Sequence, residues 1–189
     1  MTAHVKRIVI GISGASGVTI GLRLLEVLTA EKHLIISEDA KQLIEIETDL
    51  TGEEAEANAD VVHKNSDMSS SIASGSFKYD AMIIVPCSMS TLSKIATGIS
   101  DNLITRAASV CLKEHRPLVI VPRETPLSAI HLKNMTDLAQ LGVFILPACP
   151  AFYPKPEKIE DMVDFIVGRI LDVLGIENSL YDRWEGPES

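Results

Sequence analysis

The sequence predicts an α/β protein with a single domain, residues 1–189, built on a doubly wound, mostly parallel sheet. Short apolar runs rich in Val and Ile alternate with longer segments whose apolar residues repeat at helical spacing. The short runs are almost continuously hydrophobic, which is typical of strands buried on both faces. The chain has 189 residues, of which 46% are hydrophobic and 23% charged, so it can bury one substantial core.

Five strands and five helices are expected in alternation. The strand-like runs cover residues 8–12, 33–36, 81–85, 118–121 and 143–146. The helical patterns cover residues 18–30, 38–47, 102–114, 131–141 and 159–174. In such sheets, ligands bind outside the carboxyl ends of the strands.

Three segments outside these patterns also have a predicted character. Residues 51–59 are acidic and predict an exposed helical turn. The serine-rich stretch 65–76 predicts a loop over the ligand site. Residues 178–189 form a polar C-terminal tail that either frays or packs over a neighbour.

The first predicted strand ends in a loop with glycines at positions 11, 14 and 17, and a helical pattern follows it. A glycine-rich turn before a helix predicts a site for an anionic group, because the N–H groups of the first helical turn point outward. Ser13 and Ser16 add possible hydroxyl donors. The spacing matches neither the nucleotide triphosphatase loop nor the dinucleotide fingerprint. A tight turn that binds nothing is the alternative interpretation.

Two further strand ends carry polar motifs. Residues 86–91 read Pro-Cys-Ser-Met-Ser-Thr before a helix and predict a second anion cradle, with helix capping by Ser88 or Ser90 as the alternative. Residues 122–126 read Pro-Arg-Glu-Thr-Pro, and the planar guanidinium of the arginine is suited to phosphate. A surface ion pair between the arginine and the glutamate is the alternative there.

The last strand end carries two aromatic residues. The loop of residues 147–154 holds three prolines, Phe152 and Tyr153, and predicts a wall and a hydroxyl for a partly apolar ligand. Aromatic side chains that simply pack on the surface are the alternative interpretation.

Composition excludes several classes of function. A net charge of −9 without a basic block argues against nucleic acid as a partner. No apolar run approaches the ~20 residues that span a bilayer, and the N-terminal run is expected to be a strand and not a signal peptide. Three cysteines without a Cys-x-x-Cys pair predict a cytoplasmic protein without structural zinc. The acidic residues 160, 161 and 164 are interpreted as a solvated helix face, so no metal is expected.

The motifs taken together carry a family resemblance. They resemble the UbiX-type flavin prenyltransferases over nearly the whole chain, on five stretches in order: residues 11–17, 86–91, 112–118, 122–126 and 150–153. These stretches read Gly-Ile-Ser-Gly-Ala-Ser-Gly, Pro-Cys-Ser-Met-Ser-Thr, Leu-Lys-Glu-His-Arg-Pro-Leu, Pro-Arg-Glu-Thr-Pro and Pro-Ala-Phe-Tyr.

The resemblance implies a flavodoxin-like or Rossmann-like subunit that binds FMN and assembles into a homo-dodecamer. It implies transfer of a dimethylallyl group from dimethylallyl monophosphate to N5 and C6 of reduced FMN, without a metal. It also implies that the prenylated FMN passes to a UbiD-type decarboxylase, often in ubiquinone synthesis or aromatic-acid metabolism.

The resemblance also implies site residues. Those for FMN binding are Gly14, Ala15, Ser16, Ser37, Ser88, Met89, Ser90, Thr91 and Arg123. Those around the prenyl phosphate are Lys113, Arg123, Glu124, Tyr153 and Arg169, and those lining the prenyl pocket are Phe165 and Trp184. Ser16 and Glu47 are implied to handle protons near flavin N5. The acidic pair that follows Ser37 departs from the family pattern.

The implied chemistry suits these residue types, because cationic and hydroxyl donors stabilise a departing phosphate. Three alternatives are weighed against it. A flavin-dependent cysteine decarboxylase typically has Pro-Ala-Ser-Ala-Asn-Thr where this chain has residues 86–91. A non-catalytic FMN carrier would not need the second set of phosphate donors. A nicotinamide oxidoreductase would need a different glycine spacing and a ribose-binding acid.

Overall fold

The computed structural model describes residues 7–186 and contains one six-stranded, fully parallel sheet. The strands are β1 (Arg7–Ile12), β2 (Glu31–Ile36), β3 (Val61–Lys64), β4 (Ala81–Cys87), β5 (Leu118–Pro122) and β6 (Phe144–Ile145). Their order across the sheet is β3-β2-β1-β4-β5-β6. The predicted doubly wound parallel sheet is confirmed, and its strand order is that of the Rossmann fold.

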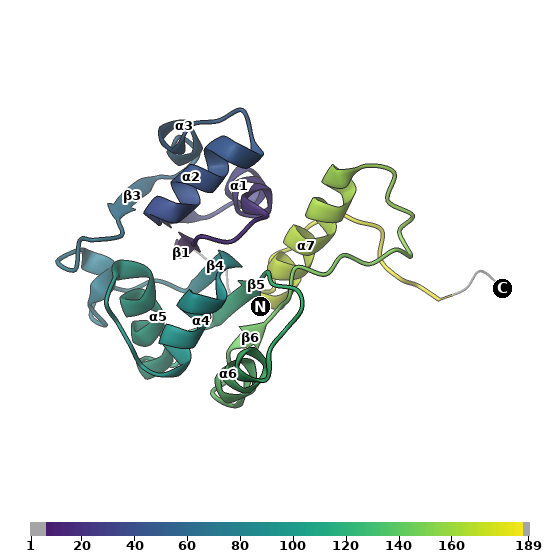
Figure 1. Ribbon diagram of the computed structural model, residues 1–189. Helices are drawn as coiled ribbons and strands as arrows, with labels where there is room; N and C mark the ends of the chain where they lie inside the picture. The colour runs from purple at the N-terminus through teal and green to yellow at the C-terminus, as the bar shows by residue number, and fades with distance from the viewer. Residues whose placement is uncertain (1–6, 187–189) are drawn as a thin grey trace.

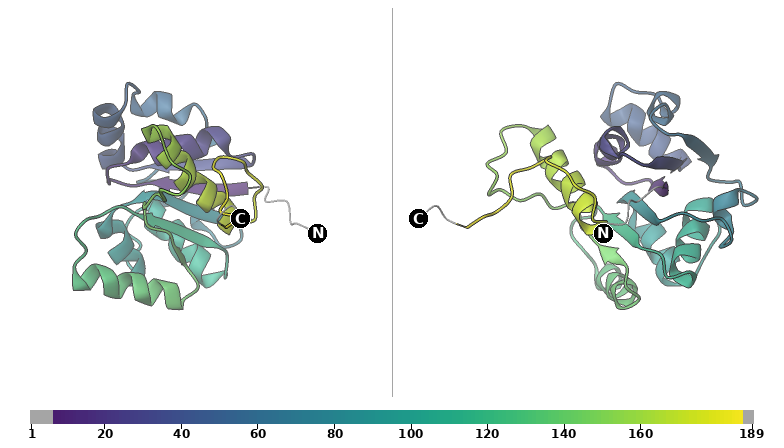
Figure 2. Two further views of the ribbon diagram at one scale, coloured as in Figure 1. Left: turned by 90° about the vertical axis from the view of Figure 1, so that its right-hand side faces the viewer. Right: turned by 180° about the vertical axis from the view of Figure 1, so that it is seen from behind.

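Two layers of helices cover the sheet (Figure 1). The helices are α1 (Val18–Val27), α2 (Glu38–Glu47), α3 (Gly52–Glu56), α4 (Met89–Ala96), α5 (Leu103–Lys113), α6 (Ala129–Gln140) and α7 (Ile159–Val173), with a 3-10 turn at Ser71–Ala73. Helices α1, α2 and α7 pack on one face, and α4, α5 and α6 pack on the other (Figures 1 and 2).

The first strand shows why the strands read as continuous apolar runs. Ile8, Ile10 and Ile12 point into the core beneath α1 and α7. Val9 points the other way, into the core beneath α4 and α5. All four side chains are fully buried, because successive residues of a strand face opposite sides and both sides are covered by helices.

The strand order places the topological switch point between β1 and β4. From β1 the chain moves outward to β2 and β3, then returns to β4 on the other side of β1. The loops that leave the carboxyl ends of β1 and β4 therefore diverge, and this is where a parallel sheet of this kind binds its ligand.

The five predicted strands and five predicted helices all occur, with bounds shifted by at most a few residues. The edge strand β3 was not predicted, and its residues Val61 and Val62 are exposed, so it lacks the buried pattern of the other strands. The acidic stretch 51–59 contains α3, in agreement with the predicted helical turn.

The serine-rich stretch of residues 65–76 is a loop with one 3-10 turn, and its place over a ligand site stays a prediction. The loop contacts α5, where Asn65 accepts from the N–H groups of Leu103 and Ile104 at the start of that helix. Arg106 of α5 donates to the carbonyl of Ala73 at 3.0 Å. Asn65 and the carbonyl of Ala73 thus attach this loop to helix α5.

Two segments project together from the sheet beside α7. The loop of residues 147–158 and the C-terminal residues 178–186 leave the body on the same side (Figures 1 and 2). We call them the arm. Between residues 7 and 186, no helix is both long and apolar enough to cross a membrane.

Candidate active site at the carboxyl edge of the sheet

Ser13 joins the two loops at the switch point. Its N–H and its hydroxyl both donate to the carbonyl of Pro86 at 3.2 Å, and its hydroxyl accepts from the N–H of Ser88 at 2.8 Å. The side chain is 2% exposed. The predicted role of this hydroxyl as a ligand donor is therefore not what the structure shows: Ser13 fixes the loop after β1 to the end of β4 and to Ser88, which follows it.

Gly14 lies where the loop after β1 touches the start of α2. A Cβ atom at this position would lie 2.6 Å from the Cβ of Asp39. Only glycine fits, and the backbone around it passes close to a neighbouring helix. Asp39 belongs to the acidic pair after Ser37, and that pair lies in the first turn of α2, where negative charge is favoured. The departure from the family pattern thus has a local structural reason.

Glu47 caps the helix that follows the glycine loop. Its Oε2 accepts from the N–H of Gly17 at 2.8 Å and from the N–H of Val18 at 3.2 Å. These are donors that the sequence assigned to an anionic ligand, so a carboxylate of the protein occupies the place predicted for that anion. The contact also brings Glu47 next to Ser16, the residue with which it was paired.

Arg123 connects the end of β5 to the glycine loop. Its Nε donates to the carbonyl of Ser16 at 3.1 Å, and its backbone N–H donates to the carbonyl of Cys87. Its side chain is half-buried, and within residues 7–186 its two terminal nitrogens donate to no group. It forms no ion pair with Glu124, so the surface-pair alternative is wrong. The geometry leaves two donors for an anion.

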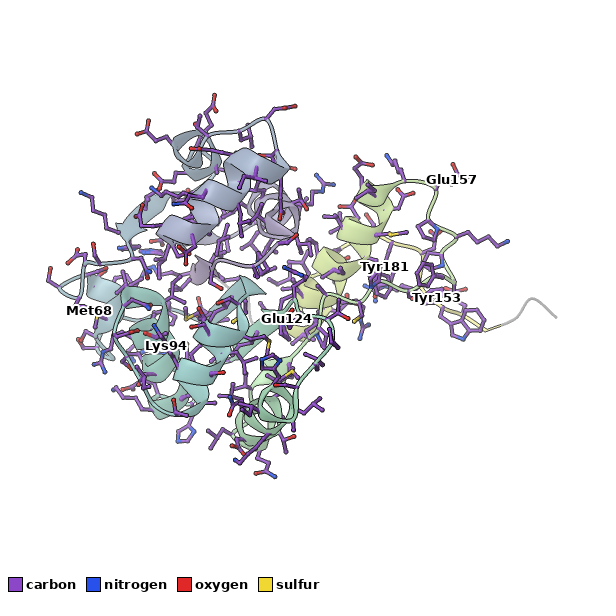
Figure 3. All side chains as sticks on the ribbon, in the orientation of Figure 1. Met68, Lys94, Glu124, Tyr153, Glu157 and Tyr181 are labelled. Carbon is purple, nitrogen blue, oxygen red and sulfur yellow. The ribbon has the colours of Figure 1, made fainter. Side chains whose placement is uncertain are left out.

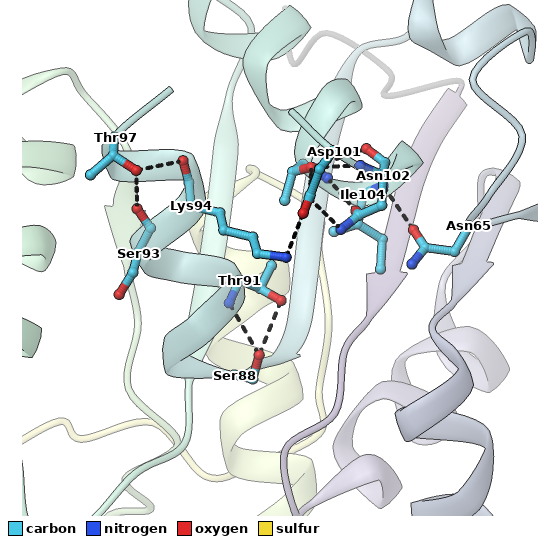
Figure 4. Close-up of polar contacts among 10 residues, drawn as sticks. Asn65, Ser88, Thr91, Ser93, Lys94, Thr97, Asp101, Asn102 and Ile104 are labelled. Atoms are coloured by element: carbon cyan, nitrogen blue, oxygen red, sulfur yellow. Dashed lines mark hydrogen bonds and ion pairs between the residues drawn. The ribbon is translucent and has the colours of Figure 1, made fainter. Parts of the chain in front are cut away.

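Serines cap two helices at this edge. The Ser88 hydroxyl accepts from the N–H of Thr91 at 3.2 Å and donates to the Thr91 hydroxyl at 3.0 Å (Figure 4). The Ser37 hydroxyl accepts from the N–H of Ala40 at 3.2 Å. The capping interpretation is confirmed for Ser88. Met89 and Ser90 occupy the first turn of α4, where the helix itself offers their N–H groups no acceptor.

Cys87 is not a nucleophile. Its side chain is fully buried at the end of β4, and burial raises the pKa of the thiol to about 12. The thiolate is the reactive form, so this sulfur is inert at neutral pH.

The remaining predicted residues lie elsewhere. Glu124 is exposed at the end of β5, where its carboxylate accepts from the N–H of Thr125 (Figure 3). In the arm, the Tyr153 ring lies 6.1 Å from Phe165 and 5.6 Å from Trp184, both edge to face. These aromatic residues therefore pack together, as in the alternative interpretation of this loop, and still present an exposed surface.

Arg169 lies on the outer surface of α7, beside the same aromatic residues. It borders a hollow of about 500 Å³ between β6 and α7, together with Phe165 and Cys149. No hydrogen bond, ion pair or ring contact in the described part of the chain joins Arg169, Tyr153, Phe165 or Trp184 to the glycine loop.

The predicted site thus falls into two groups and two single residues. The edge group consists of Gly14, Ala15, Ser16, Ser37, Glu47, Ser88, Met89, Ser90, Thr91 and Arg123. The arm group consists of Tyr153 and Trp184 of the arm together with Phe165 and Arg169 of α7. Glu124 belongs to neither group; in the sequence it follows the last residue of the edge group and precedes the first residue of the arm group. Lys113 ends α5, which leads to the amino end of β5, so within one chain it lies at the opposite edge of the sheet.

Metal binding has no support in the geometry. Across residues 7–186, no three His, Cys, Asp or Glu side chains gather closely enough to hold a metal ion. Asp161 accepts from the N–H groups of Glu157 and Lys158 and so caps α7. Asp164 is not solvated as predicted but forms an ion pair with Arg23 at 2.7 Å.

Two acidic residues that shape this region are not among the predicted site residues. Asp39 limits the space at Gly14, and Asp172 binds the C-terminal segment. Asp39 is distinguished in the sequence only as part of the acidic pair that departs from the family pattern, and Asp172 looks like an ordinary acidic residue of a helix. Their partners are distant in the sequence or lie in a tail without a regular pattern, so spacing alone could not identify them.

Comparison with known proteins identifies relatives over nearly the full chain. A family model described as Flavoprotein matches residues 2–171. A flavin prenyltransferase UbiX of Thermoplasma acidophilum is 54% identical over 94% of this chain and 99% of its own length. A flavin prenyltransferase UbiX of Methanocaldococcus jannaschii is 51% identical over 94% of this chain and 98% of its own length.

Solved structures agree. A UbiX crystal structure in complex with FMN and dimethylallyl pyrophosphate superposes with a TM-score of 0.95 at 46% identity, covering 98% of this chain and 100% of that chain. A dodecameric FMN-dependent UbiX-like protein of Escherichia coli O157:H7 gives 0.93 at 46% identity, covering 95% of this chain and 100% of that chain.

An FMN-dependent cysteine decarboxylase is only 17% identical with a TM-score of 0.61, so it shares the fold alone. The near-full-length sequence identities agree with the structure: the strand order is that of the Rossmann fold, and the edge group lies at its switch point. The chain therefore belongs to the Flavoprotein family and, within it, to the UbiX flavin prenyltransferases.

Proposed function

We propose that this protein transfers a dimethylallyl group from dimethylallyl monophosphate to reduced FMN. The observation that supports this proposal most directly is sequence identity. Over almost the whole chain, about half of the residues are identical to those of proteins named flavin prenyltransferases. The arrangement of the carboxyl edge supports it, because the residues named for FMN converge on the switch point.

The edge group suits FMN on two observations. The two terminal nitrogens of Arg123 have no acceptor in the described chain, and the first turn of α4 presents outward N–H groups. Gly14, Ala15, Ser16, Ser37, Arg123 and the first turn of α4 would hold the cofactor. When bound and reduced, FMN supplies the nucleophilic ring atoms.

The chain's own residues would orient the reactants and handle protons. The carboxylate of Glu47 is held against the backbone of Gly17, and Ser16, which carries a hydroxyl, directly precedes Gly17 in the chain. We assign these two groups to holding and moving a proton at the flavin. Arg123 would orient the anionic parts of the ligands, because its guanidinium is already anchored through Nε.

The arm group is assigned to the prenyl donor. Breaking the allylic C–O bond builds negative charge on the departing phosphate, and Arg169, Tyr153 and Lys113 provide donors to stabilise it where it develops. The Phe165 and Trp184 rings would exclude water from the allylic group and stabilise its positive charge. Glu124 is assigned to the same donor site.

Lys113 requires a second copy of the chain. It lies at the amino edge of its own sheet, so we propose that it reaches the site of a neighbouring subunit in a homo-dodecamer. The dodecameric relative supports this arrangement. We further propose a cytoplasmic location and a UbiD-type decarboxylase as the recipient of the prenylated FMN.

The direct experiment is an anaerobic incubation of the protein with reduced FMN and dimethylallyl monophosphate, followed by mass spectrometry of the flavin. We expect a mass increase equal to one dimethylallyl unit. Arg169→Ala and Tyr153→Phe are expected to retain FMN but to form the product more slowly. An unchanged flavin mass with the wild-type protein would contradict the proposal. Loss of FMN from both variants would contradict the assignment of the two groups.

A further inference from the structure

One aspartate near the end of α7 collects the hydrogen bonds that attach the C-terminal segment to the body. The Asp172 carboxylate, 16% exposed, accepts from Arg183 Nη2 at 2.7 Å. It accepts from the Tyr181 hydroxyl at 2.6 Å and from the side-chain amide of Asn178 at 2.9 Å. Three residues of the segment 178–184 therefore converge on one acceptor.

The same carboxylate contacts Arg169. Arg169 precedes Asp172 by three residues and lies on the same face of the helix. Its Nη1 is 3.4 Å from Asp172 Oδ2 and 3.4 Å from the Tyr181 hydroxyl. Burial alone would raise the pKa of Asp172, but the hydrogen bonds from Arg183, Tyr181 and Asn178 hold it below its ordinary value. The group therefore stays charged at neutral pH.

A glycine in the middle of α7 makes room for the segment. A Cβ atom on Gly168 would lie 2.5 Å from Cδ1 and 2.7 Å from Cε1 of Tyr181, and 2.9 Å from Oδ1 of Asn178. Glycine weakens a helix interior, so its presence here needs a local reason. The reason is the Tyr181 ring, which lies directly on the helix and 4.9 Å from the ring of Phe165.

Trp184 depends on this attachment. Its ring lies edge to face with Tyr153 at 5.6 Å, but it is 64% exposed and Tyr153 is 41% exposed. Such exposed rings gain little from burial. The neighbouring residues Tyr181 and Arg183, both bound to Asp172, are the anchors that place Trp184 beside Tyr153.

We propose that Asp172 is a positioning residue for the transfer reaction. It fastens segment 178–184 to α7, orients the guanidinium of Arg169 and keeps Trp184 against Tyr153. It is assigned no contact with the prenyl donor. This role rests on the proposed function, in which Arg169, Tyr153 and Trp184 form the donor's site.

The first test compares Asp172→Asn with the wild type as the full-length, FMN-loaded protein. The KM for dimethylallyl monophosphate is expected to rise by about 10- to 100-fold because the donor's groups lose their orientation. FMN affinity and the far-ultraviolet circular dichroism spectrum should not change. Trp184 is the sole tryptophan of the sequence, so its emission reports on the segment directly. We expect a shift to longer wavelength and stronger quenching by acrylamide.

Two further variants sharpen the test. Asp182→Asn is the matched control, because Asp182 is an exposed carboxylate of the same segment and accepts no hydrogen bond in residues 7–186. It should behave as wild type in every measurement. Gly168→Ala should displace the Tyr181 ring while Asp172 itself is not substituted, and alanine favours the helix. It should therefore reproduce both the change in Trp184 emission and the rise in KM while the protein stays folded.

The attachment of the segment and the positioning role of Asp172 are tested by different outcomes. Unchanged Trp184 emission in Asp172→Asn and Gly168→Ala would overturn the attachment. A released segment with an unchanged KM would overturn the positioning role. The emission measurement needs no turnover, so it decides on the attachment even with a wild-type protein that forms no prenylated flavin. That last result would count against the proposed function instead.

Discussion

At the scale of single residues, the carboxyl edge is held by contacts that leave little freedom. Ser13 donates to the carbonyl of Pro86 at the end of β4 and accepts from the N–H of Ser88 just after it. Arg123 uses one nitrogen on the Ser16 carbonyl and keeps two for other partners. Gly14 has no room for a side chain. Each of these residues can be tested by a substitution that changes one contact.

Gly14→Ala is expected to destabilise the protein by about 1–3 kcal/mol, because the new Cβ would overlap that of Asp39. Urea unfolding followed by circular dichroism measures the loss. The matched double variant Gly14→Ala with Asp39→Gly removes the opposing atom, so the cost of Gly14→Ala should shrink when measured in the Asp39→Gly background. An equal cost in both backgrounds would rule out this steric cause.

Arg123→Lys is expected to weaken FMN binding about tenfold, because an ammonium cannot hold the Ser16 carbonyl and present a planar pair of donors at once. Titration of the flavin fluorescence gives the dissociation constant. Lys133→Arg on α6 changes the same residue types at an exposed position and should leave the constant unchanged. An unaltered affinity in Arg123→Lys would remove Arg123 from the cofactor site.

The residue scale also shows what sequence reasoning can reach. Arg123 was identifiable because a guanidinium after a strand, held between prolines, has a chemistry of its own. The hydroxyl of Ser13 suggests a ligand donor in the sequence. In the fold it binds Pro86 and Ser88 instead, and these partners are more than seventy positions away, so no local pattern could indicate them. The role of a polar group depends on its neighbours in space.

At the scale of elements, helix α1 begins with help from helix α2. Glu47 ends α2 and accepts from the first N–H groups at the start of α1. Both helices start at the carboxyl edge because β1 and β2 are adjacent and parallel, and α2 then runs along the loop after β1, from Asp39 beside Gly14 to Glu47 beside Gly17. One carboxylate thereby satisfies two donors of a half-buried helix start and lies beside Ser16.

The edge strand β3 is fastened by a pair of histidines. His33 Nδ1 and His63 Nε2 lie 2.9 Å apart, and His63 Nδ1 lies 2.8 Å from the hydroxyl of Ser70. Burial, followed by the nearby His33, lowers the pKa of His63, while Asp67 acts in the opposite direction. A charged His63 is therefore disfavoured in the folded protein.

This arrangement predicts a pH dependence of stability. The unfolded chain binds a proton at His63 more readily than the folded one, so the contribution is complete above about pH 6.5 and is lost as the pH falls through the lower folded pKa. Urea midpoints at about pH 7 and about pH 5.5 should differ more for the wild type than for His63→Gln, which cannot titrate. Equal pH dependence in both proteins would contradict the prediction.

The elements themselves were largely accessible from the sequence. Strands buried on both faces and helices with one apolar stripe have periodicities that burial imposes. Strand β3 could not be predicted because it has only four residues at the edge of the sheet, and its exposed valines do not belong to the core. The serines of residues 65–76 indicate a loop but not its neighbours, because its contacts with Arg106 and Leu103 of α5 form only in the fold.

At the scale of the whole molecule, one chain does not bring all of the assigned residues together. The edge group lies at the switch point, the arm group lies on and beside α7, and Lys113 lies at the opposite edge of the sheet. A complete site in a homo-oligomer would combine surfaces of different copies. This separation had no signal in the sequence, because motif order says nothing about which subunit supplies a residue.

Subunit mixing tests that arrangement. Lys113→Ala and Arg169→Ala homo-oligomers should each form the product slowly. After dissociation and reassembly of the two together, some sites combine an intact Lys113 with an intact Arg169, so activity should recover in part. Mixed samples that stay as inactive as their parents would place both residues in one subunit's site. Size-exclusion chromatography confirms that mixed assemblies have formed.

The three thiols differ in a way that has a practical consequence. Cys87 and Cys111 are buried, and burial raises their pKa values to about 12 and about 11, while Cys149 alone is exposed, in the arm. A maleimide dye or spin label should therefore attach to the native protein at that one position without any engineered cysteine. Distances between such probes on different copies would then report directly how the arms are arranged around an assembly.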